Sequence, residues 1–127
     1  MIDGKLSCHM IYEDDDCLVI LDNYPIDNGH SLIITKKHSE KIIDMDVNDV
    51  SRLFSKVPKI ANSIIKATNA DAFSIAQNNG KAAKQIIPHV HIHVIPRYDK
   101  TGTLWTKRKI MNDNELSELA KKIKNCF

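Results

Sequence analysis

The chain has 127 residues, of which 43% are hydrophobic and 27% are charged, and its formal net charge is +2. These proportions are typical of a globular domain and exclude a disordered or fibrous chain. The small net charge, without one dominant basic block, argues against a nucleic-acid-binding or membrane-surface protein. We therefore expect one domain over residues 1–127, with no nucleic-acid partner and no membrane partner.

The three cysteines, Cys8, Cys17 and Cys126, are widely spaced and odd in number, so they indicate neither a disulfide framework nor a paired zinc motif. The N-terminal segment lacks an apolar signal region, and no stretch approaches the length of a transmembrane span. These observations favour a cytoplasmic protein. The short charged runs at 13–16 and 107–109 are expected to be solvated surface.

Turn residues divide the N-terminal half into short apolar segments, which predict β-strands joined by tight connections. The acidic run at 13–16 separates the first two strands and predicts a hairpin between them. A loop that contains Pro25 and Gly29 precedes the third strand. The expected strands are 10–12, 17–21 and 30–35, and the loop is 22–29.

Apolar side chains recur at helical spacing after Asp46, which is a suitable N-cap. We expect this amphipathic stripe to pack in the core rather than to form a site. Pro58 lies inside the stripe and is expected to kink or divide the helix, because proline lacks a backbone donor and clashes with the preceding turn. The stripe consists of Val47, Val50, Leu53, Phe54, Val57, Ala61, Ile64 and Ile65.

The C-terminal half is expected to hold a strand at 72–77, a polar loop at 78–84 and a β-rich run at 85–96. Trp105 is expected to pack against the core. A final helix has Asp113 as its candidate cap and lysines in its last turns, and its inward residues are Leu116, Leu119, Ala120 and Ile123. This order predicts an α+β fold with a mainly antiparallel sheet, one long helix and a C-terminal helix.

Half of the six histidines alternate with β-branched residues in the segment 89–95. Such alternation is typical of a strand, and residues two apart project from the same face, so three imidazoles are expected on one side of a sheet. Three histidines in register favour a site over surface decoration. The histidines are His89, His91 and His93, and the prolines expected to bracket the strand are Pro88 and Pro96.

Metal binding is one functional interpretation, because imidazole is a common zinc ligand and a His-x-His pair can chelate. At a rise of about 3.3 Å per residue, the Cα atoms of His89 and His93 lie roughly 13 Å apart, too far for both to bind one ion comfortably. No Cys-x-x-Cys pair or obvious carboxylate partner lies nearby in the sequence, which leaves distant residues such as His38 as the remaining candidate ligands. A histidine-ligated metal enzyme is the less favoured alternative, and His38 is interpreted as structural or surface.

Nucleophilic and acid–base chemistry on a phosphate ester, anhydride or phosphoramidate is the favoured interpretation. An imidazole, with an ordinary pKa of about 6.5, offers a nitrogen lone pair at neutral pH. A protonated neighbour stabilises phosphoryl oxygens, so one strand face can supply both roles.

The segment 89–95 resembles the His-φ-His-φ-His-φ-φ signature of the histidine triad (HIT) family, in which φ is an apolar residue. Upstream, the segment 21–38 is similar to the first conserved block of the family, through Leu21-Asp22, Gly29-His30 and Lys36-Lys37-His38. The segment 78–85 is similar to the loop that precedes the triad. The resemblance covers about residues 10–98 and leaves a tail and helix at 99–127.

The resemblance implies a HIT-like α+β fold and a nucleotide hydrolase that forms a covalent nucleotidyl-histidine on His91. His93 would contact phosphate oxygens, and His89 and His30 would orient His91. The implied substrate is a purine nucleoside phosphoramidate or a dinucleoside polyphosphate, cleaved at the α-phosphorus to release the nucleoside monophosphate. A homodimer with a continuous sheet is also implied, and no cofactor or metal is required. The implied nucleotide-binding residues are Asp22, Asn23, Asn78, Lys84, Gln85, Ile86, His91 and His93.

Some positions carry a second interpretation or depart from the family pattern. Asp22 either accepts from the ribose hydroxyls, with the apolar neighbours of its turn lining the base pocket, or only stabilises that turn. Lys84 stands where many relatives have glycine, and Ile86 stands where some have a hydroxyl residue. These departures favour an alternative, a nucleotide-binding interaction protein with slow turnover. The Cys-x-x-Cys pair of zinc-containing relatives is absent, so Cys8 is expected to be a strand or surface residue.

Overall fold

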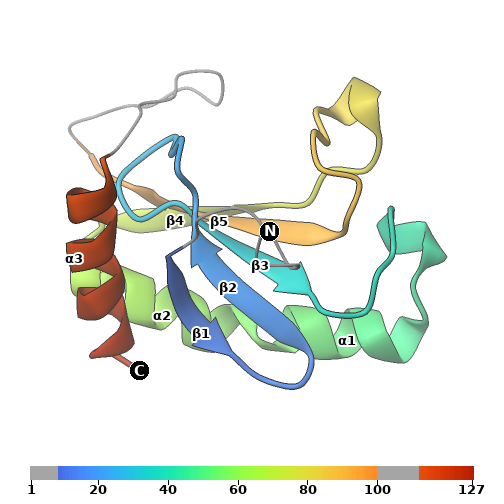
Figure 1. Cartoon of the computed structure of the whole chain (residues 1–127), viewed down its shortest axis with the longest axis horizontal. Coiled ribbons are helices and arrows are strands. Elements are labelled where there is room, and N and C mark those ends of the chain that lie inside the picture. The colour runs from blue at the N-terminus through green and yellow to red at the C-terminus, as the bar shows by residue number, and fades with distance from the viewer. Residues whose placement is uncertain (1–8, 100–111) are drawn as a thin grey trace.

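The computed structural model describes residues 9–99 and 112–127. Five strands form one sheet in the order β1-β2-β3-β5-β4, and every neighbouring pair is antiparallel. Figure 1 shows α2 running along one face of this sheet, with α3 packed beside α2 and β1. The predicted α+β fold is therefore confirmed. The elements are β1 (Met10–Glu13), β2 (Cys17–Leu21), β3 (Ser31–Thr35), η1 (Ile42–Asp44), α1 (Val47–Ser55), α2 (Val57–Thr68), β4 (Ala72–Ala76), η2 (Lys81–Ala83), β5 (His91–Arg97) and α3 (Asp113–Lys124).

The main core lies between the sheet and the helices. Alternate residues of the central strands, among them Val19, Ile33 and Ile92, are completely buried on this face. Ile60 and Ile64 of α2 pack against them. Burial of this much branched apolar surface stabilises the contact between sheet and helix and holds β5 rigidly in place.

The opposite face of the sheet carries a second, smaller apolar cluster of Ile20, Leu32 and Ile34. His91 and His93 alternate with the core residues of β5, so they project from this second face. In the strand register, His91 lies opposite Ile34 and His93 lies opposite Leu32. The fold thus places two imidazoles beside a buried apolar cluster.

The predicted long helix is two helices that meet at Lys56. Pro58 lies in the first turn of α2, where a missing backbone N–H loses no hydrogen bond. The expected division at this proline is confirmed. Asp46 is confirmed as the cap of α1, because its side chain accepts a hydrogen bond from the N–H of Asn48.

The predicted apolar stripe is corrected in α1. Val47 is 80% exposed and Phe54 is 36% exposed, and Leu53 is the residue of α1 that is buried. Leu53 packs in the main core together with Val57 of α2, so the core covers the two helices near their junction and leaves Val47 outside it. In α2 the stripe is buried as predicted at Val57, Ala61 and Ile64, and Ile60 joins it.

The β-rich run predicted at 85–96 is corrected at its start, because β5 begins at His91. Pro88 has no N–H to donate to a sheet, and Gln85 uses its side chain to hold a turn. His89 therefore precedes the strand. Of the three predicted imidazoles, only His91 and His93 share a strand face.

Two further boundaries differ from the prediction. Pro96 lies inside β5 rather than beyond it. The strand tolerates this proline because β3 pairs with β5 only as far as Val94, so no hydrogen bond to β3 is needed at Pro96. The cap of α3 is Asn112 rather than Asp113, because the side chain of Asn112 accepts from the N–H of Glu115. The predicted inward residues of α3 are all buried.

Cys8, Trp105 and the run at 107–109 lie outside the described residues, so the structure does not test the predictions made for them. Of the other cysteines, Cys17 is completely buried, and burial raises the pKa of its thiol to about 12, so it is unreactive. Cys126 is half-buried. Within 9–99 and 112–127, no helix combines the length and apolar character that a membrane crossing needs.

The acidic run at 13–16 was predicted to be solvated surface. This prediction is corrected, because three of its four residues form ion pairs. The Lys56 ammonium lies 3.0 Å from a carboxylate oxygen of Asp14 and 3.2 Å from one of Asp16. Glu13 pairs with Lys36 over 2.6 Å. Because Lys56 stands between α1 and α2, these pairs tie the β1–β2 turn to the helix junction.

The Asp14 carboxylate is the best-bonded member of this run. Burial alone would raise its pKa, but the Lys56 ammonium and the backbone N–H groups of Asp16 and Cys17 outweigh burial and hold the pKa of Asp14 well below its usual range. The ionised form is therefore stabilised in the folded chain.

Replacing Asp14 by asparagine should lower the free energy of unfolding at pH 7 by about 1 kcal/mol, because charge-assisted hydrogen bonds that water partly screens are lost. A carboxylate whose pKa is depressed by folding contributes stability above its unfolded pKa of about 3.9 and loses that contribution as the pH falls towards the folded value. Urea unfolding should therefore show a difference between wild type and Asp14→Asn that shrinks from pH 7 to pH 3. Asp15→Asn is the matched control, and a difference that does not depend on pH would contradict the assignment.

Candidate active site

His91 is held in one tautomer by the backbone. The residue is 7% exposed, and Nδ1 of its ring lies 2.8 Å from the main-chain carbonyl oxygen of His89. A carbonyl oxygen only accepts, so Nδ1 carries the proton and the lone pair of the neutral ring lies on Nε2. Among the described residues, no group forms a hydrogen bond to that Nε2. His91 therefore has the protonation that a nucleophile needs.

A chain of hydrogen bonds also fixes the protons of His30 and His93. The backbone N–H of Ile26 donates to Nδ1 of His30 over 3.0 Å, so neutral His30 carries its proton on Nε2. That Nε2 lies 2.9 Å from Nδ1 of His93, which accepts, so neutral His93 carries its proton on its own Nε2. The ring centroids of His91 and His93 are 4.9 Å apart. A lone pair and an N–H donor therefore lie side by side.

Asp22 lies at the start of the loop at 22–29. Its Oδ1 accepts from the N–H of Tyr24 over 2.8 Å, and its Oδ2 lies 3.7 Å from Nε2 of His30. The carboxylate therefore stabilises its turn, one of the two roles expected of it, and it places negative charge beside the His30–His93 pair. Asn23 is exposed next to it. Gly29 closes the loop at a φ of 93°, where a Cβ would lie 2.9 Å from a methyl carbon of Thr68.

The ring of His89 does not join the other imidazoles of the predicted triad. Its Nε2 lies 2.6 Å from the carbonyl oxygen of Thr35, and its Nδ1 lies 2.9 Å from Nδ1 of His38. The main-chain carbonyl of His89, rather than its ring, contacts His91. A backbone role of this kind has no signature in the side-chain pattern.

The apolar cluster on the site face is a feature that the sequence pattern did not single out. Strands that are buried on both faces of a sheet lose the alternation of polar and apolar residues. The continuous apolar runs at 18–21 and 32–34 were the sequence signal for a second buried face. This apolar floor lies beside the imidazoles and has little free area, because Ile20, Leu32 and Ile34 are 2%, 5% and 2% exposed. The floor consists of Ile20, Leu32 and Ile34, with Leu18 packed against it.

Gln85 braces the loop before the triad from within. Its side chain is buried, its Oε1 accepts from the N–H of Gly80 over 2.6 Å, and its Nε2 donates to the carbonyl of Glu40 over 2.5 Å. Asn79 acts similarly, because its Oδ1 accepts from the N–H of Ile42 over 2.7 Å. These two amides tie the loop to the segment after β3, and a nucleotide contact by the Gln85 side chain would compete with both of its bonds.

Three other residues expected to bind nucleotide are accessible. The half-buried Asn78 has no hydrogen bond from its side chain to any group in the described part of the chain. Ile86 is 88% exposed. Lys84 is exposed and has a φ of 68°, a left-handed conformation that a glycine adopts without strain. The lysine therefore occupies a position whose backbone suits the glycine of many relatives.

Asp22, His30 and His93 offer three possible metal-ligand atoms within 4.8 Å of one another. The proton positions argue against an ion there. Nδ1 of His30 accepts from the N–H of Ile26, so its Nε2 carries the ring proton and has no lone pair for a metal. Because His30 is completely buried, losing that backbone bond would leave an unsatisfied donor. The cluster fits a hydrogen-bond relay better than a metal centre.

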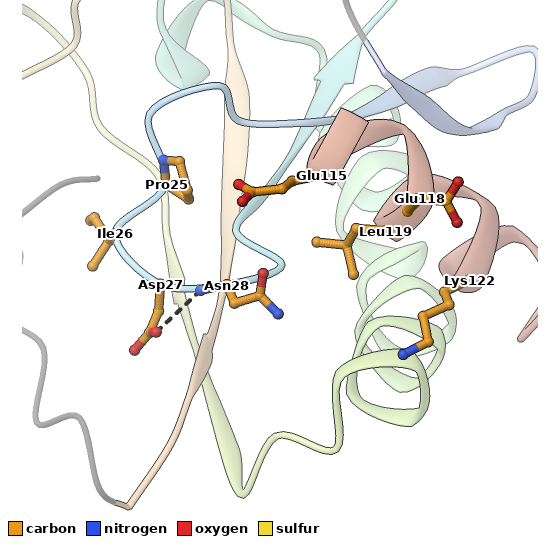
Figure 2. Close-up of a pocket in the computed structure, with 8 residues that line it drawn as sticks. All are labelled: Pro25, Ile26, Asp27, Asn28, Glu115, Glu118, Leu119 and Lys122. Carbon is orange, nitrogen blue, oxygen red and sulfur yellow. Dashed lines mark hydrogen bonds between the residues drawn. The ribbon is translucent and has the colours of Figure 1, made fainter. Parts of the chain in front are cut away.

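A separate cavity of about 610 Å³ lies between the loop at 22–29 and α3 (Figure 2). Apolar Ile26 and Leu119 line it together with the charged Glu115 and Lys122. None of the imidazoles lines it. The cavity is therefore not the histidine site, although Ile26 belongs to its wall and also donates to His30.

The paired imidazoles, their fixed protons and the apolar floor on an antiparallel sheet define a histidine triad protein. The chain belongs to the HIT domain family, whose model matches residues 3–100. The adenylylsulfatase HINT3 of Arabidopsis thaliana is 44% identical over 124 residues, which cover 94% of this chain. The matched region spans 62% of that relative, so the relative is the longer protein.

Solved structures agree with this assignment. A Hit-like protein of Bartonella henselae superposes with a TM-score of 0.91 and 33% identity, covering 99% of this chain and 91% of that chain. The diadenosine triphosphate hydrolase of Plasmodium falciparum superposes with a TM-score of 0.79 and 26% identity, covering 92% of this chain and 74% of that chain. Family membership together with these relatives supports a nucleotide-binding or nucleotide-hydrolysing protein.

Replacing Lys84 by glycine should raise the free energy of unfolding by about 0.5 kcal/mol, because the relief of left-handed strain exceeds the entropy that glycine adds to the unfolded chain. Lys81→Gly is the matched control, since Lys81 is an exposed lysine of the same loop without a positive φ, and it should lose stability. Urea midpoints of the two variants and the wild type give the comparison. Loss of stability in both variants would mean that the Lys84 side chain makes a stabilising contact.

Proposed function

We propose that this protein is a nucleotide hydrolase in which Nε2 of His91 attacks the α-phosphorus of a purine nucleotide. The observation that carries the proposal is the hydrogen bond from Nδ1–H of His91 to the carbonyl of His89, because it puts the lone pair on Nε2. The neighbouring His93, with its proton on Nε2, is suited to donate to phosphoryl oxygens. The names of two similar proteins, an adenylylsulfatase and a diadenosine triphosphate hydrolase, support chemistry at a nucleoside phosphate.

The reaction proceeds in two displacements. The lone pair on Nε2 of His91 forms an N–P bond, and the bond from phosphorus to the leaving group breaks with its electrons on the leaving group. The ring is then cationic, and its Nδ1–H bond to the carbonyl of His89 strengthens. Water next attacks phosphorus, the N–P electrons return to Nε2, and the proton that the water loses passes to solvent, which balances the proton that the leaving group takes up from solvent. The products are the leaving group and a nucleoside monophosphate.

The proposed substrates are purine nucleoside phosphoramidates and dinucleoside polyphosphates, and no metal or cofactor takes part. The apolar neighbours of the Asp22 turn would line the base pocket, and Asp22 with Asn23 would face the ribose. Asn78 would face the phosphates, because its amide makes no other described bond. Adenosine 5′-phosphosulfate belongs in the same test, since the Arabidopsis relative is named an adenylylsulfatase.

His91→Ala should lower the rate of AMP release from adenosine phosphoramidate, diadenosine triphosphate or adenosine 5′-phosphosulfate by at least about a thousandfold, because the covalent route is lost. Rates are measured with and without chelator, and the wild-type rate should not change. Acid-quenched single turnovers with labelled substrate should trap label on wild type and none on His91→Ala. Equal turnover by both proteins would remove His91 as the nucleophile, and loss of activity with chelator would establish a metal enzyme.

The alternative of a binding protein with slow turnover rests on the strained Lys84 and the exposed Ile86. It predicts tight binding of adenosine monophosphate by calorimetry without a labelled adduct from any of the three substrates. An adduct that forms within one turnover and then hydrolyses would contradict this alternative.

We further propose that the chain forms a homodimer through β4. This strand is one edge of the sheet, since it pairs with β5 and with no other described strand. Its side chains Phe73 and Ile75 are 40% and 46% exposed. An open edge with exposed apolar residues pairs readily with a second copy, which would make one continuous sheet with two sites.

Ile75→Lys should shift the solution mass from twice the chain mass of 14.4 kDa to that mass, because a charge at the edge opposes strand pairing. Light scattering after size exclusion measures this mass. Ile43→Lys is the control, since Ile43 is 83% exposed away from β4 and should leave the mass unchanged. A wild type that has the monomer mass would contradict the dimer.

A further inference from the structure

A second pair of imidazoles lies outside the site described above. Nδ1 of His38 and Nδ1 of His89 are 2.9 Å apart, and the ring centroids are separated by 4.9 Å at an interplanar angle of 61°. His38 is exposed and His89 is half-buried. The sequence pattern indicated only a structural or surface role for His38, and this contact gives it a specific partner.

The proton count of the pair follows from a backbone carbonyl. Nε2 of His89 lies 2.6 Å from the carbonyl oxygen of Thr35, which only accepts, so that Nε2 carries a proton. In the neutral His89 ring Nδ1 is then an acceptor, and the hydrogen bond between the rings requires a proton on Nδ1 of His38. His38 is therefore the donor and His89 the acceptor.

The His89 residue is held at each of its polar groups. Its ring is bound at both nitrogens, its N–H donates to the carbonyl of Ile87 over 2.8 Å, and its carbonyl accepts from Nδ1 of His91. The next N–H, that of Val90, donates to the carbonyl of Ser39 over 2.8 Å. Residues 35–39 thus frame the peptide on which the tautomer of His91 depends.

We propose that His38 is a positioning residue for His91, acting through His89. The Nδ1–H of His38 holds the His89 ring, and the ring, together with the Thr35 carbonyl, orients the His89 peptide so that its carbonyl accepts from Nδ1–H of His91. Removing the donor leaves the lone pair on Nδ1 of His89 without its protein partner, so that the Thr35 carbonyl alone holds the ring. The Nδ1–H tautomer of His91 then loses its advantage over the Nε2–H tautomer, which has no nucleophilic lone pair on Nε2.

The role in turnover rests on the proposed function, but the tautomer can be measured without any reaction. Long-range ¹H–¹⁵N spectra of ¹⁵N-labelled protein at pH 7.5 report which ring nitrogen carries the proton, and comparison with His91→Gln assigns the His91 signals. Wild type should show His91 protonated on Nδ1. His38→Ala should show a mixture of the two tautomers, and His38→Asn, whose amide N–H can replace the Nδ1–H donor, should restore the wild-type pattern.

The rate of turnover should rank the variants in the same order as the tautomer spectra. His38→Ala should lower kcat about three- to tenfold, as for the loss of one hydrogen bond, and leave KM within about twofold, because His38 is not among the residues proposed to bind the nucleotide. His38→Asn should recover most of kcat. Ser39→Ala is the matched control, since it changes a neighbouring side chain with no described hydrogen bond and keeps the carbonyl that binds Val90.

Two results would overturn the proposal. The first is a His38→Ala variant, shown to be folded by its unfolding midpoint, that keeps both the wild-type His91 tautomer and the wild-type kcat. The second is stoichiometric zinc in purified wild type that is lost in His38→Ala, because the facing nitrogens would then be metal ligands and not a hydrogen-bonded pair. If wild type shows no turnover at all, the proposed function fails, and the spectra still decide the role of His38.

Discussion

The site depends on hydrogen bonds between imidazoles and backbone groups whose roles cannot change. A peptide carbonyl only accepts and a peptide N–H only donates, so each contact fixes the proton of the ring that makes it. The carbonyl of His89 fixes His91, and the N–H of Ile26 fixes His30 and, through it, His93. Three rings of the same residue type thereby acquire different functions, which side-chain chemistry alone would not assign.

The sheet supplies the rigidity that these contacts need. The three inner strands are buried on both faces, and the main core against α2 holds β5 in place while its other face carries the imidazoles. The same burial produces the apolar floor of Ile20, Leu32 and Ile34 beside them. One packing arrangement therefore positions the histidines and places buried apolar side chains beside them.

Two connecting segments complete the frame around the start of β5. The segment after β3 binds the loop before β5 through Gln85 and Asn79, and it binds the entry of the strand through the carbonyls of Thr35 and Ser39. Buried amides take the place of a regular ladder here, because Pro88 prevents one. Lys84 carries the strain of a left-handed turn within this frame. The loop conformation is thus maintained by the surrounding bonds despite that local cost.

Much of the fold follows from local patterns. The apolar runs indicated the strands, Asp46 indicated a cap, and Pro58 indicated the division between α1 and α2, because capping and proline geometry act over a few residues. The exposure of Val47 was not predicted, since only the assembled structure shows that the core reaches α1 near its junction with α2 and not at Val47. The place of Pro96 inside β5 also depended on where β3 stops pairing, which only the assembled sheet decides.

For the site, the sequence by itself determined that several histidines would meet on a strand and that His91 and His93 would share one face, because alternation along a strand is a local property. The tertiary structure decided that His89 would precede the strand and turn its ring to Thr35 and His38. It also decided which nitrogen of each ring carries the proton. These outcomes depend on backbone groups that folding brings together from distant parts of the chain. The spacing of side chains along the sequence therefore could not predict them.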